Sequence, residues 1–236
     1  MSVTTIIGGQ WGDEGKAKII DYLARDADYV VRYQGGANAG HTVVVGEKRF
    51  AFHLVPSGIL YPQITCILGG GMVIDPIALA AEMDQLAAEG IDVTDRILIS
   101  EQAHVVMPYH ILMDKASETR LGGASIGTTC KGISPAYVDK VGRDGMRMYD
   151  FLRSRSDLEQ FLTQRIRRKN KQLRQMNVSP IPVGKTVEQI ARLKKRMEPL
   201  ITDTRVTLWD ARDAKKNILL EGAQGTLLDI DHGTYP

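Results

Sequence analysis

The sequence lacks any apolar run that approaches the roughly 20 residues needed for a membrane-spanning helix, so we expect no membrane contact. It holds only two cysteines, Cys66 and Cys130, which are far apart and share no spacing typical of a metal site. We therefore expect two free thiols in a reducing compartment. A formal charge of +2 on 236 residues gives no overall field that attracts nucleic acid.

The chain also lacks a Walker A loop, although a glycine-rich stretch at residues 8–18 follows an apolar, strand-like run at residues 3–7. A Walker A loop requires a glycine five residues before Gly15 and a serine or threonine after Lys16. Those positions hold Gln10 and Ala17. A phosphate loop here must therefore be of another kind.

The glycine-rich stretch nevertheless predicts a phosphate site. A turn between a strand and a helix start aims backbone N–H groups at one point, and the helix dipole adds positive charge there. Lys16 and Lys18 add full charges, whereas Asp13 and Glu14 would repel a phosphate unless one binds Mg²⁺ or moves a proton. The combination indicates chemistry on a phosphate. The alternative is an ordinary tight turn with two surface lysines.

A second strand-like run leads into a loop of small residues at residues 35–42. Small side chains allow a ligand to approach the backbone closely. Asn38 can donate and accept hydrogen bonds, and His41 can exchange a proton near neutral pH. A lone histidine is usually structural or solvated, but this one has few packing neighbours in sequence.

Four separated motifs carry a resemblance to a known family. Residues 10–18 match the first signature of the adenylosuccinate synthetases except at Ala17, and residues 38–42 match their Asn-Ala-Gly-His-Thr segment. Residues 132–143 match a second signature except at Ser134, and residues 221–236 also read as family sequence. The chain resembles this family from end to end.

The resemblance implies a GTP-dependent carbon–nitrogen ligase that joins IMP and L-aspartate through a 6-phosphoryl-IMP intermediate, in the first step from IMP to AMP. It also implies Mg²⁺, a cytoplasmic location and a homodimer in which Arg143 acts across the interface. Asp13 would remove the N1 proton of the purine and contact Mg²⁺. Lys16 and His41 would stabilise the transferring phosphoryl group, and Lys140 is a further catalytic candidate.

The resemblance implies binding residues as well. The expected GTP contacts are Gly12, Asp13, Glu14, Gly15, Lys16, Ala17, Lys18, Gly40, His41 and Thr42. The expected IMP contacts are Asp13, Glu14, Gly15, Lys16, Asn38, Ala39, Gly40, His41, Thr129, Arg143 and Gln224. The expected metal ligands are Asp13 and Gly40, the latter through its carbonyl oxygen.

The segments by which the family recognises guanine and binds aspartate have no counterpart here, so we interpret residues 1–236 as the N-terminal portion of one synthetase domain. A non-catalytic nucleotide-binding fragment is one alternative. A related purine-nucleotide–aspartate ligase that accepts another base is a second. Ala17 would obstruct a phosphate if its φ angle were positive, and Ser134 replaces a glycine in a loop expected near the nucleotide phosphate.

The hydrophobic pattern predicts an α/β fold: a mainly parallel central sheet flanked by helices, with a P-loop-NTPase-like layout. Expected strands are residues 3–7, 29–33, 64–68, 97–100 and 218–220, and residues 43–52 read as a hairpin. Asp75 and Pro76 predict a helix start, and Gly90 its end. Ligand loops are then expected at the carboxyl ends of the strands.

Residues 154–199 read as a helical, basic insertion. A capping box predicts a helix start at Ser156, and a second basic helix is expected over about residues 187–197. The basic run could contact nucleic acid or a membrane. We favour a solvated helix face, because the run lacks interleaved aromatic residues for stacking on bases.

Overall fold

The structure, a computed structural model, describes residues 1–12, 14–45, 48–122 and 127–234, with the backbone alone described for residues 41–45 and 48–51. The strands are β1 (Val3–Gly8), β2 (Tyr29–Gly35), β3 (His41–Val45), β4 (Lys48–Phe52), β5 (Thr65–Ile74), β6 (Ile97–Ser100), β7 (His104–Val105), β8 (Ile201–Thr202) and β9 (Ile218–Gly225). The α-helices are α1 (Lys16–Ala24), α2 (Pro76–Ala88), α3 (Pro108–Leu121), α4 (Ile133–Val141), α5 (Arg155–Gln175), α6 (Val183–Met197) and α7 (Thr204–Asp213).

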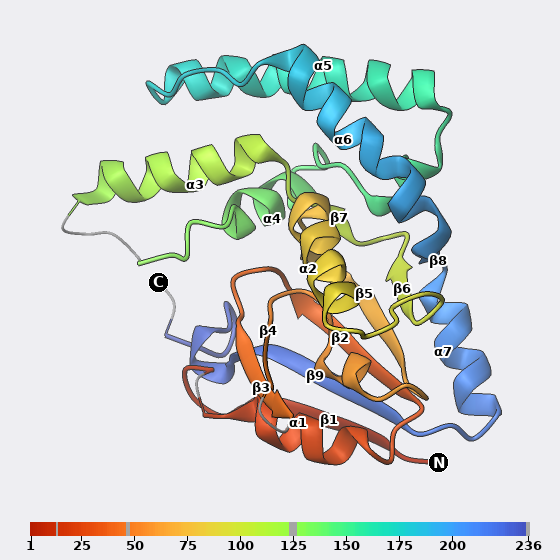
Figure 1. Cartoon of the computed structure of the whole chain (residues 1–236). Coiled ribbons are helices and arrows are strands. Elements are labelled where there is room, and N and C mark those ends of the chain that lie inside the picture. Colours follow the sequence, from red (N-terminus) through yellow and green to blue (C-terminus); the bar gives the residue numbers. More distant parts are fainter. Residues whose placement is uncertain (13, 46–47, 123–126, 235–236) are drawn as a thin grey trace.

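The central sheet has seven strands in the order β1-β9-β2-β5-β6-β8, with β7 beside β5 (Figure 1). Every pairing within it is parallel. The predicted α/β fold with a mainly parallel sheet is confirmed. Strand β9, near the end of the chain, lies between β1 and β2, so the carboxyl ends of these three strands are neighbours.

Helices cover both faces of the sheet, because alternate residues of a strand point to opposite sides. On one face, Val30 and Leu68 pack into the main core with Ile20 of α1 and Leu79 of α2. On the other face, Val31 and its neighbours pack against Ala211 of α7. The middle strands β2 and β5 are therefore buried between layers, as parallel strands generally are, whereas the edge strand β1 is largely exposed.

The predicted hairpin is present as a separate two-stranded sheet of β3 and β4. The strands pair antiparallel from His41 opposite Phe52 to Val45 opposite Lys48. The expected turn at Gly46 and Glu47 lies outside the described residues. The hairpin leaves the central sheet directly after the loop that follows β2.

Helix starts follow local capping chemistry. Asp75 caps α2 as predicted, since its carboxylate accepts hydrogen bonds from the amides of Ile77 (2.9 Å) and Ala78 (3.2 Å). The prediction that the helix of the basic region, α5, starts with a capping box at Ser156 is wrong. The cap of α5 is Ser154, whose hydroxyl accepts a hydrogen bond from the amide of Asp157 at 3.1 Å. The following helix, α6, also begins earlier than expected, directly after Pro182.

The two helices of the basic region pack against each other, and they also pack against α3 and α2 (Figure 1). Part of the basic run is structural. Lys169 is 3% exposed in its side chain and pairs with Asp139 and Asp144, while Arg165 pairs with Asp144 at 3.0 Å. None of the described helices is long and apolar enough to cross a membrane.

Candidate functional site

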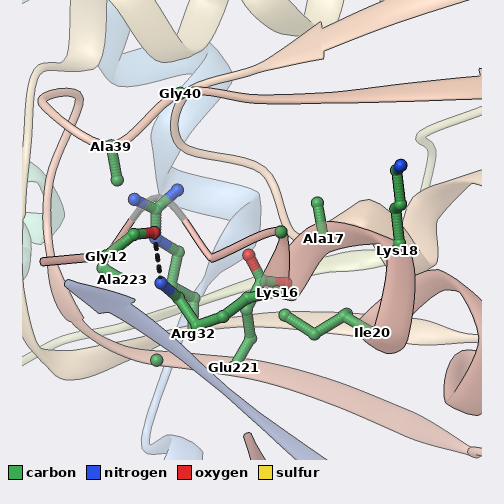
Figure 2. A pocket seen from close by; sticks show the side chains of 12 residues that line it. Gly12, Lys16, Ala17, Lys18, Ile20, Arg32, Ala39, Gly40, Glu221 and Ala223 are labelled. Atoms are coloured by element: carbon green, nitrogen blue, oxygen red, sulfur yellow. Dashed lines mark hydrogen bonds between the residues drawn. The ribbon is translucent and has the colours of Figure 1, made fainter. Parts of the chain in front are cut away.

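A cavity of about 230 Å³ lies at the carboxyl ends of β1, β9 and β2, where an open parallel sheet typically binds its ligand (Figure 2). Three chain segments that are distant in sequence form it. The lining residues are Gly12, Gly15, Lys16, Ala17, Lys18, Ile20, Arg32, Ala39, Gly40, Glu221, Gly222 and Ala223. The cavity thus unites the two loops that the sequence singled out.

The glycine-rich loop delivers the start of α1 to this cavity. Gly15, the residue before the helix, has a left-handed backbone with φ 84°, which brings the chain sharply into its first turn. The first amides of a helix have no partner within the helix, so they are available to an anion. Lys16 is the first helical residue, and its Nζ donates a hydrogen bond to the carbonyl of Gly12 at 2.6 Å (Figure 2).

The glycine-rich loop also carries two acidic residues, Asp13 and Glu14, and an alanine, Ala17, at a position where the family has glycine. Glu14 accepts a hydrogen bond from the amide of Gln10, and its pKa is lowered, mainly by a hydrogen bond from its own backbone. Asp13 lies outside the described residues. Ala17 is the second residue of α1 and has no positive φ, so its methyl group causes no backbone strain. Ser134 is exposed on the first turn of α4.

The end of β9 closes the glycine-rich loop from the side. Gly225 pairs with Gly8, the Thr226 hydroxyl donates to the carbonyl of Gly8 at 2.8 Å, and the amide of Leu227 donates to the carbonyl of Gln10 at 3.0 Å. The sequence predicted that this strand ends at residue 220. It continues to Gly225, because the last residues of β9 still pair with β1.

The loop after β2 forms the opposite wall. The Asn38 side-chain oxygen accepts a hydrogen bond from the amide of Gly36 at 3.2 Å, which holds a tight turn and places Ala39 and Gly40 at the cavity. His41 and Thr42 begin β3 immediately afterwards, but their side chains lie outside the described part of the structure. The Gln224 side chain lies against Gly35, at the end of β2.

Three further predicted residues lie elsewhere. Thr129 lines a second cavity of about 520 Å³ between α2 and α3. Lys140 and Arg143, at the end of α4, line neither of these two cavities. Nζ of Lys140 lies 3.4 Å from the carbonyl oxygen of Gly70, and burial and then the charge of Arg147 lower its pKa. Arg143 is exposed, has a φ of 57° and makes no ion pair with the described residues.

The second cavity has charged walls of both signs. Its lining residues are Ala37, His53, Asp75, Ala78, Ala81, Glu82, Gln85, Ile111, Lys115, Thr129, Cys130 and Lys131. Ala37 belongs to the loop after β2, so one loop borders both cavities. The sequence indicated only Thr129 among these residues.

Two buried charges of the first cavity were not predicted as site residues. Arg32 on β2 is 0% exposed and Glu221 on β9 is 2% exposed, and the two stand opposite each other in the strand register. Burial lowers the pKa of Arg32 and raises that of Glu221, while the charge of each opposes the shift of the other. A charged residue within an apolar strand run was the available sequence signal.

The family model for adenylosuccinate synthetase matches residues 5–236. The chain belongs to the adenylosuccinate synthetase family. It is 50% identical to the adenylosuccinate synthetase of Pelotomaculum thermopropionicum and 53% identical to that of Heliobacterium modesticaldum, covering 100% of this chain and 55% of either relative. The chain thus spans about half the length of the curated relatives it matches.

Solved structures agree with this membership. The fully ligated adenylosuccinate synthetase of Plasmodium falciparum matches with a TM-score of 0.91 and 34% identity, over 99% of this chain and 54% of that one. The succinoaminodeoxyadenylate synthetase of cyanophage S-2L, bound to dGMP and dATP, matches with a TM-score of 0.65 at 22% identity. The second likeness shows the shared fold alone.

Proposed function

We propose that this chain supplies the phosphate-handling part of a cytoplasmic adenylosuccinate synthetase, which joins IMP and L-aspartate with GTP as the energy donor. The observation that carries the proposal is the first cavity, where Lys16 and the start of α1 meet Gly40 across the carboxyl ends of three parallel strands. Adenylosuccinate synthetases are GTP-dependent ligases, and the family match extends over nearly the whole chain.

The reaction must activate an amide-like oxygen, which is both a poor nucleophile and a poor leaving group. In our proposal, Asp13 removes the N1 proton of IMP, and the purine 6-oxygen then attacks the γ-phosphorus of GTP, so that GDP leaves. The amino group of aspartate next attacks carbon 6, and inorganic phosphate leaves with the former 6-oxygen. A positioned base of this kind typically contributes about 10²–10⁴ in rate.

Fixed positive groups stabilise the charge that develops during this transfer. Lys16 is already held at the cavity by its hydrogen bond to Gly12. We propose that His41 donates a hydrogen bond or a proton to the phosphate oxygens. The backbone amides of the glycine-rich loop and of residues 40–42 would bind the triphosphate. Glu14 and Lys18 would contact GTP from the same glycine-rich loop. Lys140 remains a catalytic candidate.

The nucleotide IMP would extend from this cavity toward Asn38 and Gln224, whose amide groups suit the 6-oxygen region. Thr129 and Arg143 would bind its 5′-phosphate. Arg143 is exposed and has no ion pair within the described part of the chain, which suits a residue that meets a group on another subunit. We therefore propose that the protein forms a homodimer in which Arg143 of each subunit completes the site of the other.

A magnesium ion fits the donor set of this cavity. The described residues contain no group of three His, Cys, Asp or Glu side chains that could hold a metal. Mg²⁺ is usually bound through one or two protein oxygens together with substrate phosphates and water. Gly40 lines the cavity and offers a carbonyl oxygen, and Asp13 would add a carboxylate. When bound, Mg²⁺ supplies neutralising charge to the triphosphate.

Binding of GTP to Lys16→Met tests the proposal on this chain, with Lys171→Met as the matched control. Lys171 is exposed on α5 and far from the cavity in sequence and fold. We expect Lys16→Met to weaken GTP binding at least tenfold, about 1.4 kcal/mol, and Lys171→Met to leave it unchanged. Calorimetric titration in the presence of Mg²⁺ measures both.

The segments by which the family recognises guanine and binds aspartate have no counterpart in residues 1–236. We therefore expect this chain to bind ATP as well as GTP. We also expect it to form no adenylosuccinate alone, because positioning of aspartate is worth about 7–11 kcal/mol of barrier. Equal GTP affinity of Lys16→Met and the unmodified chain would overturn the proposed site. A chain that binds no triphosphate would do the same. Synthesis of a product from another purine nucleotide would instead favour the related ligase with a different base.

A further inference from the structure

The segment at residues 36–53 leaves the sheet after β2, forms the β3–β4 hairpin and returns close to its starting point. Arg32 joins the two ends of this segment. Its Nη2 donates a hydrogen bond to the carbonyl of Gly36 at 2.9 Å, and its Nη1 donates to the carbonyl of His53 at 2.5 Å. One guanidinium therefore closes the base of the loop and hairpin that begin with Ala39, Gly40 and His41.

The guanidinium is well suited to this task. Arg32 is fully buried, and its planar fork can donate to two carbonyl groups at fixed angles. Its burial costs free energy, which the charge of Glu221 opposite it on β9 partly offsets. Because a buried ion pair is weak evidence for net stability, we attribute to Arg32 a role in geometry.

A carboxylate holds the return of the segment from the other side. The Glu82 carboxylate on α2 accepts hydrogen bonds from three successive backbone amides, of His53 (3.1 Å), Leu54 (3.0 Å) and Val55 (3.1 Å). Glu82 is 8% exposed. The backbone of His53 is thus fixed at both its N–H and its C=O. The His53 ring in turn lies against Gly40, where an added Cβ would be 3.1 Å from the ring.

We propose that Arg32 is a positioning residue that, together with Glu82, sets the location of Gly40 and His41 at the triphosphate. The inference deepens the proposed function and rests on it. Figure 2 shows the guanidinium of Arg32 beneath the bend at Ala39, within the lining of the first cavity. Arg32 acts through the backbone of residues 36–53 rather than on the substrate itself.

The test compares Arg32→Lys with Arg96→Lys. Arg96 is a matched control because it also forks onto backbone carbonyls, donating to Ile59 at 2.7 Å and to Asp92 at 2.8 Å, but it lines neither cavity. A lysine keeps the charge of either residue and loses the fork. The two readouts are amide hydrogen exchange across residues 36–53 and calorimetric affinity for GTP with Mg²⁺.

We expect Arg32→Lys to raise exchange in residues 36–53 selectively and to weaken GTP binding at least tenfold. Arg96→Lys should leave both at the level of the unmodified chain. In Arg32→Ala, added guanidinium ion should restore slow exchange and GTP affinity together, whereas Arg32→Lys should not respond to it. The rescue separates a missing fork from a general loss of folding.

Unchanged amide exchange in Arg32→Lys would show that the hydrogen bonds of Arg32 to Gly36 and His53, here called the clamp, do not hold residues 36–53, even if the unmodified chain binds GTP. Faster exchange with unchanged GTP affinity would show that the clamp is structural only and would overturn the positioning role. Absence of GTP binding by the unmodified chain would instead reject the proposed function and, with it, this inference. The exchange measurement distinguishes these failures because it requires no ligand.

Discussion

Gly225 is the point at which β9 touches the glycine-rich loop, and replacing it with alanine tests the geometry of the site most directly. A Cβ at residue 225 would lie 2.0 Å from the carbonyl oxygen of Gln10 and 2.4 Å from the amide nitrogen of Gly12. Both atoms belong to the backbone, so no side chain can move aside. Ordinary contact begins near 3.4 Å, and the loop must therefore retreat from β9 by about 1.4 Å.

The cost follows from this displacement. Overpacking of a rigid site typically costs about 1–3 kcal/mol and occasionally more. We expect Gly225→Ala to lie at the upper end, near 3 kcal/mol, because hydrogen bonds at Gly8 and Gln10 are strained at the same time. With a urea dependence of about 3 kcal/mol per molar, the midpoint of unfolding would fall by about 1 M.

Gly9→Ala is the matched control, since a Cβ at Gly9 would meet no heavy atom within 4 Å and its φ is not positive. We expect it to change the free energy of unfolding by about 0.5 kcal/mol at most. Urea unfolding and GTP titration should be run on both variants. If Gly225→Ala unfolds at the same urea concentration as Gly9→Ala, the described contact between β9 and the loop is wrong.

Two further predictions concern groups away from the cavity. Asp139 is buried, accepts a hydrogen bond from Nε2 of His110 at 2.9 Å and pairs with Lys169, so Asp139→Asn should lower the free energy of unfolding by about 3 kcal/mol. Asp84→Asn, which loses an exposed pair with Arg196, should lower stability far less in the same urea assay, because solvent screens that pair, and equal losses would contradict the buried network. Burial, followed by the charges of Lys140 and Arg147, lowers the pKa of His104 to about 4, compared with 6.5 in an unfolded chain. The unfolded state therefore binds the proton first, and stability should fall as pH decreases from 6.5 to 4. His104→Gln should flatten this decline, and an unchanged pH profile of unfolding would exclude His104 as its source.

Local patterns in the sequence determined much of the fold. Each of the five strands predicted for the central sheet is present, because runs of apolar residues bounded by turn residues require no distant information. The hairpin and the start of α2 at Asp75 followed for the same reason. The motifs at residues 10–18 and 38–42 also located two walls of the cavity, since loops after parallel strands meet at one edge of a sheet.

Capping was decided by competition between nearby groups. Ser154 and Ser156 both stand at the start of α5, and by residue type each could serve as its cap. The hydroxyl that reaches the amide three residues ahead in the folded helix belongs to Ser154. A pattern of residue types does not distinguish the two serines.

Only the tertiary structure decided which charges meet. The order β1-β9-β2 places Glu221 opposite Arg32, although the two are far apart in sequence, and Glu82 reaches three amides at the base of the hairpin from a different layer. Thr129 likewise lies in a second cavity rather than with Lys16. The sequence by itself determined the loops and their chemistry, because those depend on neighbours along the chain. The buried clamp of Arg32 and Glu82 depends on packing between distant segments, which has no local signature.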